Sequence, residues 1–378
     1  MKQCTYLDFG SVHRLTGILQ RINPGGILLV TGKSSYISSG AEEALSRILK
    51  HYRVSRFCDF ETNPRIADVE KGVELFQEQD FDVLVSVGGG SVLDMSKLIN
   101  VISAQDAAAG EIIQHQEHIN RQGVPLIAIP TTAGSGSEAT HFAVVYIDRT
   151  KYSVSHAFML PDFALIDPYL TCSMTPMLTA TTGMDAFSQA VESFWCVHST
   201  KQSKAYAREA IRLILDHLHR AVHDPSHESR RAMCKASYLA GQAIDISKTT
   251  APHALSYAMT SHFGVPHGQA VGVTLGEFVI FNSQVTDEDV VDARGAEYVR
   301  YTMKELYKLL GCVDATASHD RILNLMTSIG LRTRLSELGI ESPSDCEVII
   351  DQINLERLAN NPRSVTKASI REIINRVV

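Results

Sequence analysis

The sequence predicts two domains of different class, an α/β domain over residues 1–168 and an all-α domain over residues 169–378. In the first half, short apolar runs alternate with amphipathic segments, which is the pattern of a parallel sheet with crossover helices. The runs are almost continuously apolar, as expected for strands that are covered on both faces. Beyond Pro168, strand signals become rare and long segments of helical periodicity dominate.

The elements of the first domain follow one another in a regular order. Residues 26–30 predict a strand, and residues 40–52 have the spacing of a helix. A second strand at residues 83–87 ends in three glycines, and a third at residues 125–129 is followed by Pro-Thr-Thr. We place the domain boundary at residues 166–168, because proline disfavours helix for the residue before it.

The second domain is predicted to consist of long helices. The clearest periodic segments are residues 177–197, 203–222 and 229–247, and several more lie beyond Asp287. No repeat of fixed period and no low-complexity tract separates the two halves.

Length, charge and cysteine usage exclude several classes of protein. A chain of 378 residues is long enough for two sizeable cores, and its net charge of −7 gives no reason to expect nucleic acid or an anionic membrane as partner. No apolar stretch predicts a transmembrane helix, and the N-terminal segment lacks the apolar core of a signal peptide. The seven cysteines form no Cys-x-x-Cys pair, so we expect reduced thiols in a cytoplasmic protein and no disulfide or zinc–thiolate site.

Two loops that follow predicted strands have the composition of a phosphate-binding site. Residues 88–91 (GGGS) precede a helix over residues 92–98, so a flexible turn leads into free N–H groups that suit a phosphate. Residues 130–138 add hydroxyls and glycines after the next strand. The glycine triplet alone is equally compatible with a simple strand-to-helix turn. The spacing also departs from the Gly-x-Gly-x-x-Gly of ordinary dinucleotide folds.

A third loop bears on the choice of nicotinamide cofactor. An acidic residue at such a strand end would accept hydrogen bonds from an adenosine 2′-hydroxyl. Gly32, Lys33 and Ser34 offer space, positive charge and a donor instead, which favours the 2′-phosphate of NADP(H) over NAD(H). The alternative interpretation is a solvated lysine in a turn.

A second constellation is typical of a metal site. Asp185 and Gln189 are four residues apart and therefore share a helix face. His253 and His267 follow later in the chain, and one carboxylate with two imidazoles suits a divalent transition metal. The Gln189 amide oxygen offers a fourth, weaker ligand. Taken singly, each histidine is more typical of a structural role than of a ligand, so the prediction of a metal site depends on the motifs together.

Together these motifs resemble the iron-containing (group III) alcohol dehydrogenase family from about Leu7 to the C-terminus. The matching stretches are residues 88–91 with Asp94 and Lys97, residues 131–138, 165–168 and 183–186, and His253 with residues 266–268. The resemblance implies a nucleotide-binding α/β domain, a helical domain of the dehydroquinate synthase-like type, and a metal that meets the nicotinamide in the cleft between them. It also implies Fe²⁺ as the metal, with Zn²⁺ as an alternative, and a homodimer. The cofactor-binding residues expected from the loops and the resemblance are Gly32, Lys33, Ser34, Gly88, Gly89, Gly90, Ser91, Asp94, Thr131, Thr132, Ser135 and Ser137.

The family pattern places the metal ligands at Asp185, position 189, His253 and His267. Position 189 is histidine in the usual pattern and glutamine here, which suggests a weaker site or a different metal. Tyr257 stands where many members have a further histidine, so Tyr257 or a water would have to carry the proton.

Three stretches, residues 188–195, 198–200 and 247–253, look like the phosphonoacetaldehyde reductase (hydroxyethylphosphonate dehydrogenase) branch. A phosphonate needs a cation and hydroxyl donors, which residues 248–250 could supply beside a metal ligand. The plainer interpretation is a helix boundary with a solvated lysine and a threonine N-cap. The candidate substrate-binding residues are Lys248, Thr249, Thr250 and Lys151, and the candidate catalytic residues are Tyr257 and Lys248.

The sequence therefore predicts metal-dependent, NAD(P)H-linked reduction of a small anionic aldehyde, with phosphonoacetaldehyde reduced to 2-hydroxyethylphosphonate as the leading reaction. Three alternatives stay open: an iron-type dehydrogenase for another small alcohol, a dehydroquinate-synthase-like cyclase, and a non-enzymatic nucleotide-binding protein whose metal site has decayed at Gln189.

Overall fold

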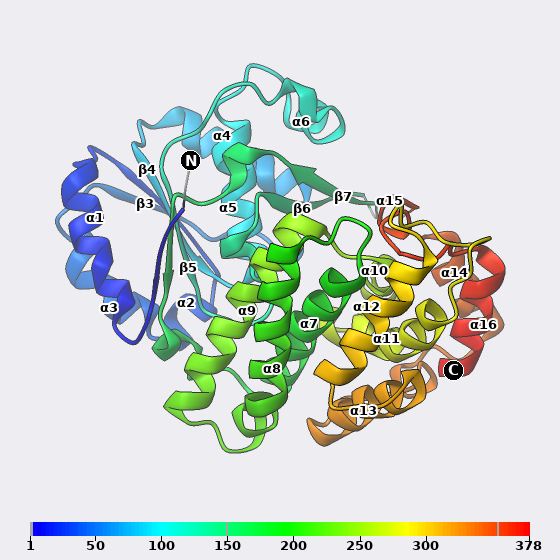
Figure 1. Ribbon diagram of the computed structural model, residues 1–378. Coiled ribbons are helices and arrows are strands. Elements are labelled where there is room, and N and C mark those ends of the chain that lie inside the picture. The colour runs from blue at the N-terminus through cyan, green and yellow to red at the C-terminus, as the bar shows by residue number, and fades with distance from the viewer. Residues whose placement is uncertain (1–2, 149, 354) are drawn as a thin grey trace. The chain divides into compact units, whose positions relative to one another are not determined.

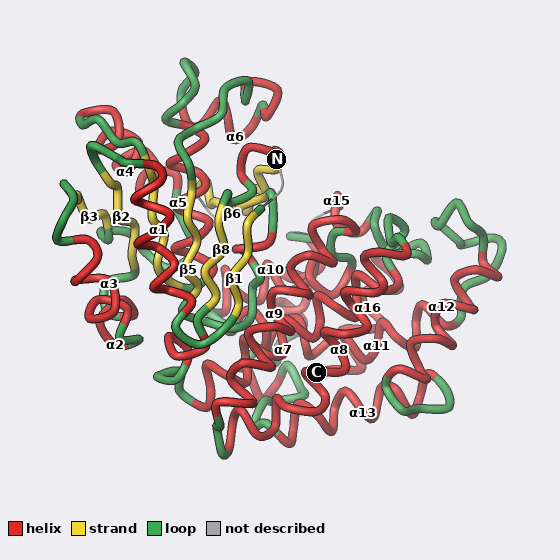
Figure 2. The backbone as a smooth tube through the Cα atoms, turned by 60° about the vertical axis from the view of Figure 1, so that its left-hand side comes forward, coloured by secondary structure: helices red, strands yellow, loops and turns green. Residues whose placement is uncertain are grey.

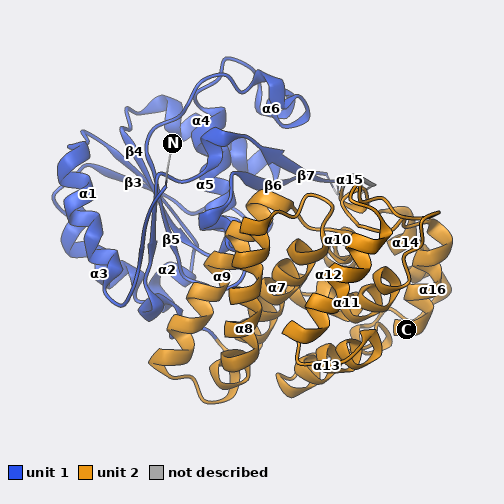
Figure 3. Ribbon diagram, viewed as in Figure 1, with its two compact units in different colours: residues 1–174 blue, residues 175–378 orange. Residues whose placement is uncertain are grey.

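The computed structural model describes residues 3–148, 150–353 and 355–378, and it divides into two compact units at Met174 and Thr175 (Figure 3). All strands of the described residues lie in the first unit, and the second is built from helices (Figure 2). The predicted fold class, an α/β domain followed by an all-α domain, is confirmed. The unit boundary falls slightly beyond residues 166–168, because Pro168–Thr171 forms a short 3₁₀ helix within the first unit.

The first unit is built on a six-stranded parallel sheet in the order β1-β8-β5-β4-β2-β3. The three predicted strands became β2, β4 and β5 in its centre, where every residue of each is buried. An antiparallel pair, β6 and β7, stands apart from the sheet. The strands are β1 (Cys4–Leu7), β2 (Ile27–Thr31), β3 (Val54–Phe57), β4 (Val83–Gly88), β5 (Leu126–Pro130), β6 (Phe142–Ile147), β7 (Thr150–Ser155) and β8 (Phe163–Ile166).

Helices cover both faces of this sheet (Figure 1). Helices α1 and α3 pack on one face, while α4, α5 and α6 contribute to the core on the other. The alternation of strand side chains between two apolar layers explains why the predicted strands lack polar positions. The helices are α1 (Arg14–Ile22), α2 (Ser35–Ser38), α3 (Ala41–Leu49), α4 (Ile66–Glu78), α5 (Gly90–Ile102) and α6 (Ala109–Gln114).

The register of the sheet brings the ends of its central strands together. Gly88 pairs with Pro130 across β4 and β5, and Thr31 pairs with Val87 across β2 and β4. Since all of these strands are parallel, the loops that follow β2, β4 and β5 leave the sheet at the same carboxyl edge, where ligands bind in such sheets.

The second unit packs around α7, which is buried along almost its whole length and contacts α8, α9 and α11. Side chains of Thr175, Thr200 and Ser226 cap the starts of α7, α8 and α9, which explains why these helices begin there. The helices are α7 (Pro176–Trp195), α8 (Lys201–His223), α9 (His227–Ser247), α10 (Ala251–Phe263), α11 (His267–Ser283), α12 (Ala296–Leu309), α13 (Ala315–Ser328), α14 (Pro343–Asp351), α15 (Leu355–Leu358) and α16 (Lys367–Val377). The three predicted helices correspond to α7, α8 and α9.

All seven cysteines are free thiols. Among the described helices, none is both long and apolar enough to span a membrane.

Gly268 allows α11 to approach α7 closely. A Cβ atom at Gly268 would overlap the carbonyl oxygen of Thr181, a backbone atom that cannot move aside cheaply. At Gly272, one turn later, a Cβ atom would meet only flexible methionine side chains, the nearest atom being 3.0 Å away in Met184.

We therefore expect Gly268→Ala to lower the free energy of unfolding by about 2–3 kcal/mol more than Gly272→Ala. Urea unfolding of both variants measures the difference, and equal losses would contradict this account.

A buried carboxyl in the first unit predicts a pH-dependent stability. Glu138 is 2% exposed, and burial raises its pKa to about 7, although a backbone N–H and the charge of Lys97 act to lower it. The folded protein therefore binds more protons than the unfolded chain between the ordinary glutamate pKa and about pH 7, so stability falls as pH rises through this window.

Glu138→Gln cannot ionise. Between pH 5 and pH 8 we therefore expect its free energy of unfolding, measured relative to that of the natural protein, to rise by about 2–3 kcal/mol. Urea unfolding at the two pH values measures the gain. The exposed Glu74→Gln is the control, and an equal gain there would contradict the assignment to Glu138.

Candidate active site

The loops after β4 and β5 lie against each other. A Cβ atom at Gly89 would stand 3.3 Å from the Thr132 side chain, and one at Gly90 would stand 2.7 Å from the Ser135 hydroxyl. Glycine at these positions lets the two loops pack closely, and helix α5 begins directly at Gly90. The structure thus brings two of the three predicted cofactor loops together at a helix N-terminus.

Asp94 holds these loops in place. Its Oδ1 accepts a hydrogen bond from the Ser137 hydroxyl at 2.6 Å, and its Oδ2 accepts one from the Val144 backbone at 3.0 Å. Burial raises the pKa of Asp94, and the nearby charge of Lys97 opposes that shift. Asp94 therefore joins α5 to the second loop and to β6.

Thr131 offers a buried side-chain hydroxyl at the start of the second loop. Its hydroxyl is buried and makes no hydrogen bond with any described residue, although its backbone N–H donates to the Gly88 carbonyl at 3.0 Å. A buried hydroxyl without a partner is costly, so this position is suited to a ligand's hydrogen bond.

Beside the third loop stand two charged residues that the sequence pattern did not indicate, Asp59 and Arg56. Lys33 forms an exposed ion pair with Asp59 at 3.0 Å, and the Asp59 carboxylate raises the pKa of the lysine. Arg56 donates to the Thr31 hydroxyl at 2.8 Å and lies over the Tyr36 ring. An arginine on β3, next to β2 in the sheet, is the signal that would have pointed to a second cation at this loop.

Three of the predicted metal ligands converge in the second unit. Single donor atoms of Asp185, His253 and His267 all lie within 4.8 Å of one another. Asp185 Oδ1 is 3.3 Å from His253 Nε2 and 3.9 Å from His267 Nε2. The first two side chains are buried and His267 is about one-third exposed. A carboxylate oxygen and two imidazole nitrogens at this spacing fit a divalent transition metal.

The three ligands come from α7, α10 and the first residue of α11. The close approach at Gly268 places His267 beside α7, because an added Cβ atom would also stand 2.9 Å from the Asp185 backbone nitrogen. Gln189 lies one turn after Asp185 on α7 and is 4% exposed. The helix geometry thus keeps the predicted fourth ligand on the same face.

Glu192 is a further functional candidate, one that the sequence motifs did not single out. It is fully buried, and the His253 Nδ1–H donates to its Oε1. Burial acts to lower the pKa of His253, but the charges of Glu192 and Asp185 outweigh burial and raise that pKa to about 9. The spacing Asp185, Gln189, Glu192 marks one helix face and could have identified it.

The predicted substrate residues lie in the turn between α9 and α10. Lys248 is partly exposed and adopts φ 71° and ψ 175°. Thr249 is buried, and its carbonyl accepts a hydrogen bond from Asn360 at 2.9 Å. Thr250 donates its hydroxyl proton to Glu192 at 2.8 Å and accepts from Trp195 at 2.9 Å. The Thr250 hydroxyl proton is therefore already donated within the protein and is not available to a substrate.

The two remaining candidates lie on different elements. Tyr257 is on α10 one turn after His253, and its ring centroid is 6.3 Å from that of His267. Lys151 is on β7 in the first unit, where its charge acts to lower the pKa of Asp94.

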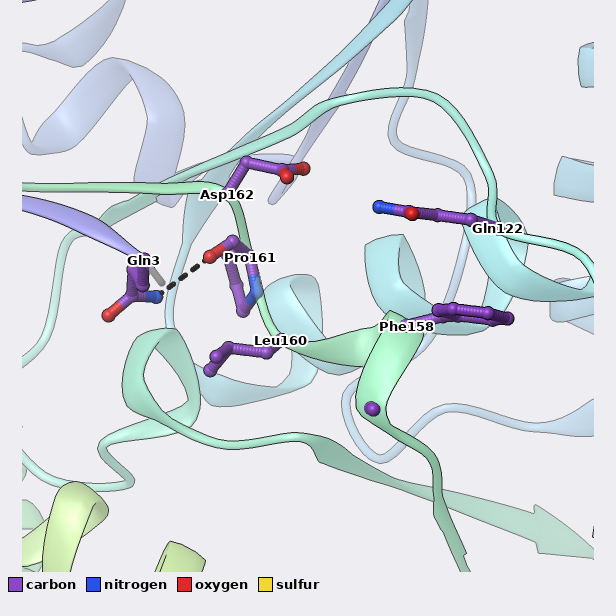
Figure 4. A pocket seen from close by; sticks show the side chains of 7 residues that line it. Gln3, Gln122, Phe158, Leu160, Pro161 and Asp162 are labelled. Atoms are coloured by element: carbon purple, nitrogen blue, oxygen red, sulfur yellow. Dashed lines mark hydrogen bonds between the residues drawn. The ribbon is translucent and has the colours of Figure 1, made fainter. Parts of the chain in front are cut away.

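A pocket elsewhere in the first unit contains none of these residues (Figure 4). It is lined by residues around the start of β8, and the Gln3 amide donates to the Pro161 carbonyl at 3.0 Å at its rim. The lining residues are Gln3, Gln122, Ala157, Phe158, Leu160, Pro161 and Asp162. They include neither a phosphate-binding loop nor a metal-ligand set, so this pocket does not compete as the active site.

Comparisons with known proteins identify the family of this chain. Residues 5–168 match the family model "Iron-containing alcohol dehydrogenase", and residues 179–378 match "Fe-containing alcohol dehydrogenase family, C-terminal". Long-chain-alcohol dehydrogenase 1 of Geobacillus thermodenitrificans is 30% identical over 98% of this chain and 93% of its own length. Phosphonoacetaldehyde reductase of Streptomyces viridochromogenes is 31% identical over 78% of this chain and 75% of its own.

A solved structure is similar throughout. Sulfoacetaldehyde reductase from Bifidobacterium kashiwanohense, in complex with NAD⁺, superposes with a TM-score of 0.88 at 30% identity and covers 99% of this chain and 96% of its own. With both units matched, the chain belongs to the iron-containing alcohol dehydrogenase family and is a nicotinamide-dependent oxidoreductase acting on alcohols.

Proposed function

We propose that this protein reduces a small anionic aldehyde to its alcohol with NAD(P)H and a bound divalent metal, and that phosphonoacetaldehyde, giving 2-hydroxyethylphosphonate, is its substrate. The main support for an anionic substrate is the backbone conformation of Lys248. A positive φ with an extended ψ is a conformation that glycine adopts almost exclusively, and a side chain there costs about 1–3 kcal/mol. A lysine at such a costly position, five residues before His253, supports a role for its charge.

The turn that carries Lys248 is held from several sides. The Cys196 thiol donates to the Ser247 carbonyl at 2.6 Å, and Asn360 donates to the Thr249 carbonyl at 2.9 Å. These bonds, with those from Thr250 to Glu192, compensate the strain. Lys248 and Thr249 are therefore the proposed phosphonate-binding residues, and Lys151 is a second candidate cation.

The relatives favour the same chemistry. A phosphonoacetaldehyde reductase and a sulfoacetaldehyde reductase are both about 30% identical to this chain, and each is named for a two-carbon aldehyde with an anionic head group.

We propose that Asp185, His253 and His267 hold the metal, with Gln189 as a further neutral ligand. Fe²⁺ is the metal that the family favours, and Zn²⁺ suits the same donors. When bound, the nicotinamide supplies the hydride and the ion stabilises negative charge on the substrate oxygen. Tyr257, one turn from His253, is the proposed carrier of the proton that this oxygen requires.

For the nucleotide, we propose that the N-terminus of α5 and the Thr131 hydroxyl bind the phosphates. Lys33 and Arg56 beside Gly32 support NADP(H) over NAD(H), whereas Asp59 offers the carboxylate that would favour NAD(H). A homodimer and a cytoplasmic location are further proposals that rest on the family resemblance and on the free thiols.

A second candidate function is oxidation or reduction of an uncharged alcohol or aldehyde. It is favoured by the long-chain-alcohol dehydrogenase, which matches 98% of this chain at 30% identity.

His267→Ala should release most of the metal, because it removes one of the three converging donors. We expect metal content by elemental analysis to fall at least tenfold, and activity to fall with it. His262→Ala, a histidine of the same helical unit outside the ligand set, is the control. A His267→Ala protein that keeps its full metal content would rule out the proposed ligand set.

The substrate is tested by following nicotinamide absorbance with metal-loaded enzyme, offered phosphonoacetaldehyde, sulfoacetaldehyde or propionaldehyde, each with NADPH and with NADH. We expect the anionic aldehydes to be turned over faster than propionaldehyde. Two variants separate the charge of Lys248 from its backbone strain. Lys248→Ala keeps the strain and loses the charge, whereas Lys248→Gly loses both.

Both variants should raise the KM for the anionic aldehydes at least tenfold more than the KM for propionaldehyde. Only Lys248→Gly should raise the melting temperature, by several degrees. Equal KM changes for charged and uncharged aldehydes would return the protein to the general alcohol dehydrogenase function.

A further inference from the structure

We propose that Glu192 is a positioning residue for the metal site: it fixes the orientation and tautomer of His253 so that Nε2 is presented to the metal. This inference rests on the metal site proposed above, since Glu192 itself is not one of the converging donors. It lies on α7, seven residues after Asp185, on the face that also carries Gln189.

The contacts of His253 divide between its two ring nitrogens. The Nδ1–H donates to Glu192 Oε1, and Nε2 faces Asp185 Oδ1 at 3.3 Å. When a metal replaces the proton on Nε2, a ring whose other proton is held on Nδ1 directs its Nε2 lone pair toward the side of Asp185 and His267. A carboxylate behind a ligating imidazole also makes that ring a stronger donor.

Both carboxylate oxygens of Glu192 accept hydrogen bonds, which a residue that only fills space would not need. It has no exposed surface, and its Oε2 accepts hydrogen bonds from the Thr250 backbone N–H at 2.6 Å and from the Thr250 hydroxyl at 2.8 Å. The Thr250 hydroxyl in turn accepts from Trp195 Nε1 at 2.9 Å. A buried carboxylate costs several kcal/mol unless it is paired in this way, and an apolar residue would pack at no such cost.

The same carboxylate connects the metal site with the strained turn. One oxygen contacts His253, and the other holds Thr250, two residues after Lys248. The Gln189 amide is a weaker donor than an imidazole, and the carboxylate behind His253 offsets part of this difference by making that ring a stronger donor.

The test is metal affinity of the full-length protein. Metal-free protein is titrated with Co²⁺, followed by its visible absorption, and with Zn²⁺ in competition with a chelator. We expect Glu192→Gln to weaken the Kd for both ions by about 10–100-fold, the range found when such carboxylate partners are removed. The matched control is Glu277→Gln, a buried carboxylate of the same unit that pairs with His319 and Arg376, and its Kd should stay within threefold.

The melting temperature of each metal-free variant separates a positioning role from a purely structural one. A Glu192→Gln protein that melts earlier yet binds Co²⁺ and Zn²⁺ as tightly as the natural protein would overturn the proposal and leave the metal site intact. If the natural protein binds neither ion, the proposed metal site fails as well.

A second measurement needs no Glu192 variant and covers the case in which Glu192→Gln does not fold. Nitrogen-15 NMR of histidine-labelled, zinc-loaded natural protein reports which ring nitrogen carries the proton. We expect a zinc-dependent histidine signal, absent in His253→Ala, that is protonated on Nδ1 and bound to zinc through Nε2. The opposite assignment would overturn the proposal.

Discussion

The burial of α7 is the constraint on which the second unit depends. The helix is enclosed by α8, α9 and α11, so every polar side chain on it must find its partners inside the protein. Asp185, Gln189 and Glu192 lie on one face of this helix, and Asp185 and Glu192 meet His253 from two sides. These acidic and amide groups would destabilise an isolated apolar helix, and here they form the frame of the proposed metal site.

Close backbone approach makes that frame possible. The N-terminus of α11 reaches the α7 backbone because residue 268 has no Cβ atom, and His267 is the residue immediately before it. Packing and chemistry are therefore coupled at this point, since the contact that stabilises the two helices also places a donor beside Asp185. The turn before α10 shows the reverse relation, because there the surrounding hydrogen bonds hold Lys248 in a conformation that its own side chain disfavours.

In the first unit, the sheet and two glycines bring the ligand-binding loops together. Parallel strands deliver three loops to one edge of the sheet, and glycines at positions 89 and 90 let two of them touch. Asp94 then ties the second loop to α5 through Ser137, which prepares the donors around Thr131 before any ligand arrives. Preformed donors of this kind reduce the ordering that a nucleotide must bring about when it binds.

The sequence by itself determined the class of both units, the three central strands and the long helices, because apolar periodicity is a local property that burial imposes on each element. It also determined that Asp185 and Gln189 share a face, since helix geometry relates residues four apart. The family motifs brought His253 and His267 into the same prediction. Only the tertiary structure decided which partners these side chains have. No local sequence pattern encodes the hydrogen bond from His253 to Glu192 or the ion pair of Lys33 with Asp59, because each joins separate elements. The same holds for the backbone conformation of Lys248. These features arise from the packing of helices or strands against one another, because packing determines which groups a buried polar side chain can contact.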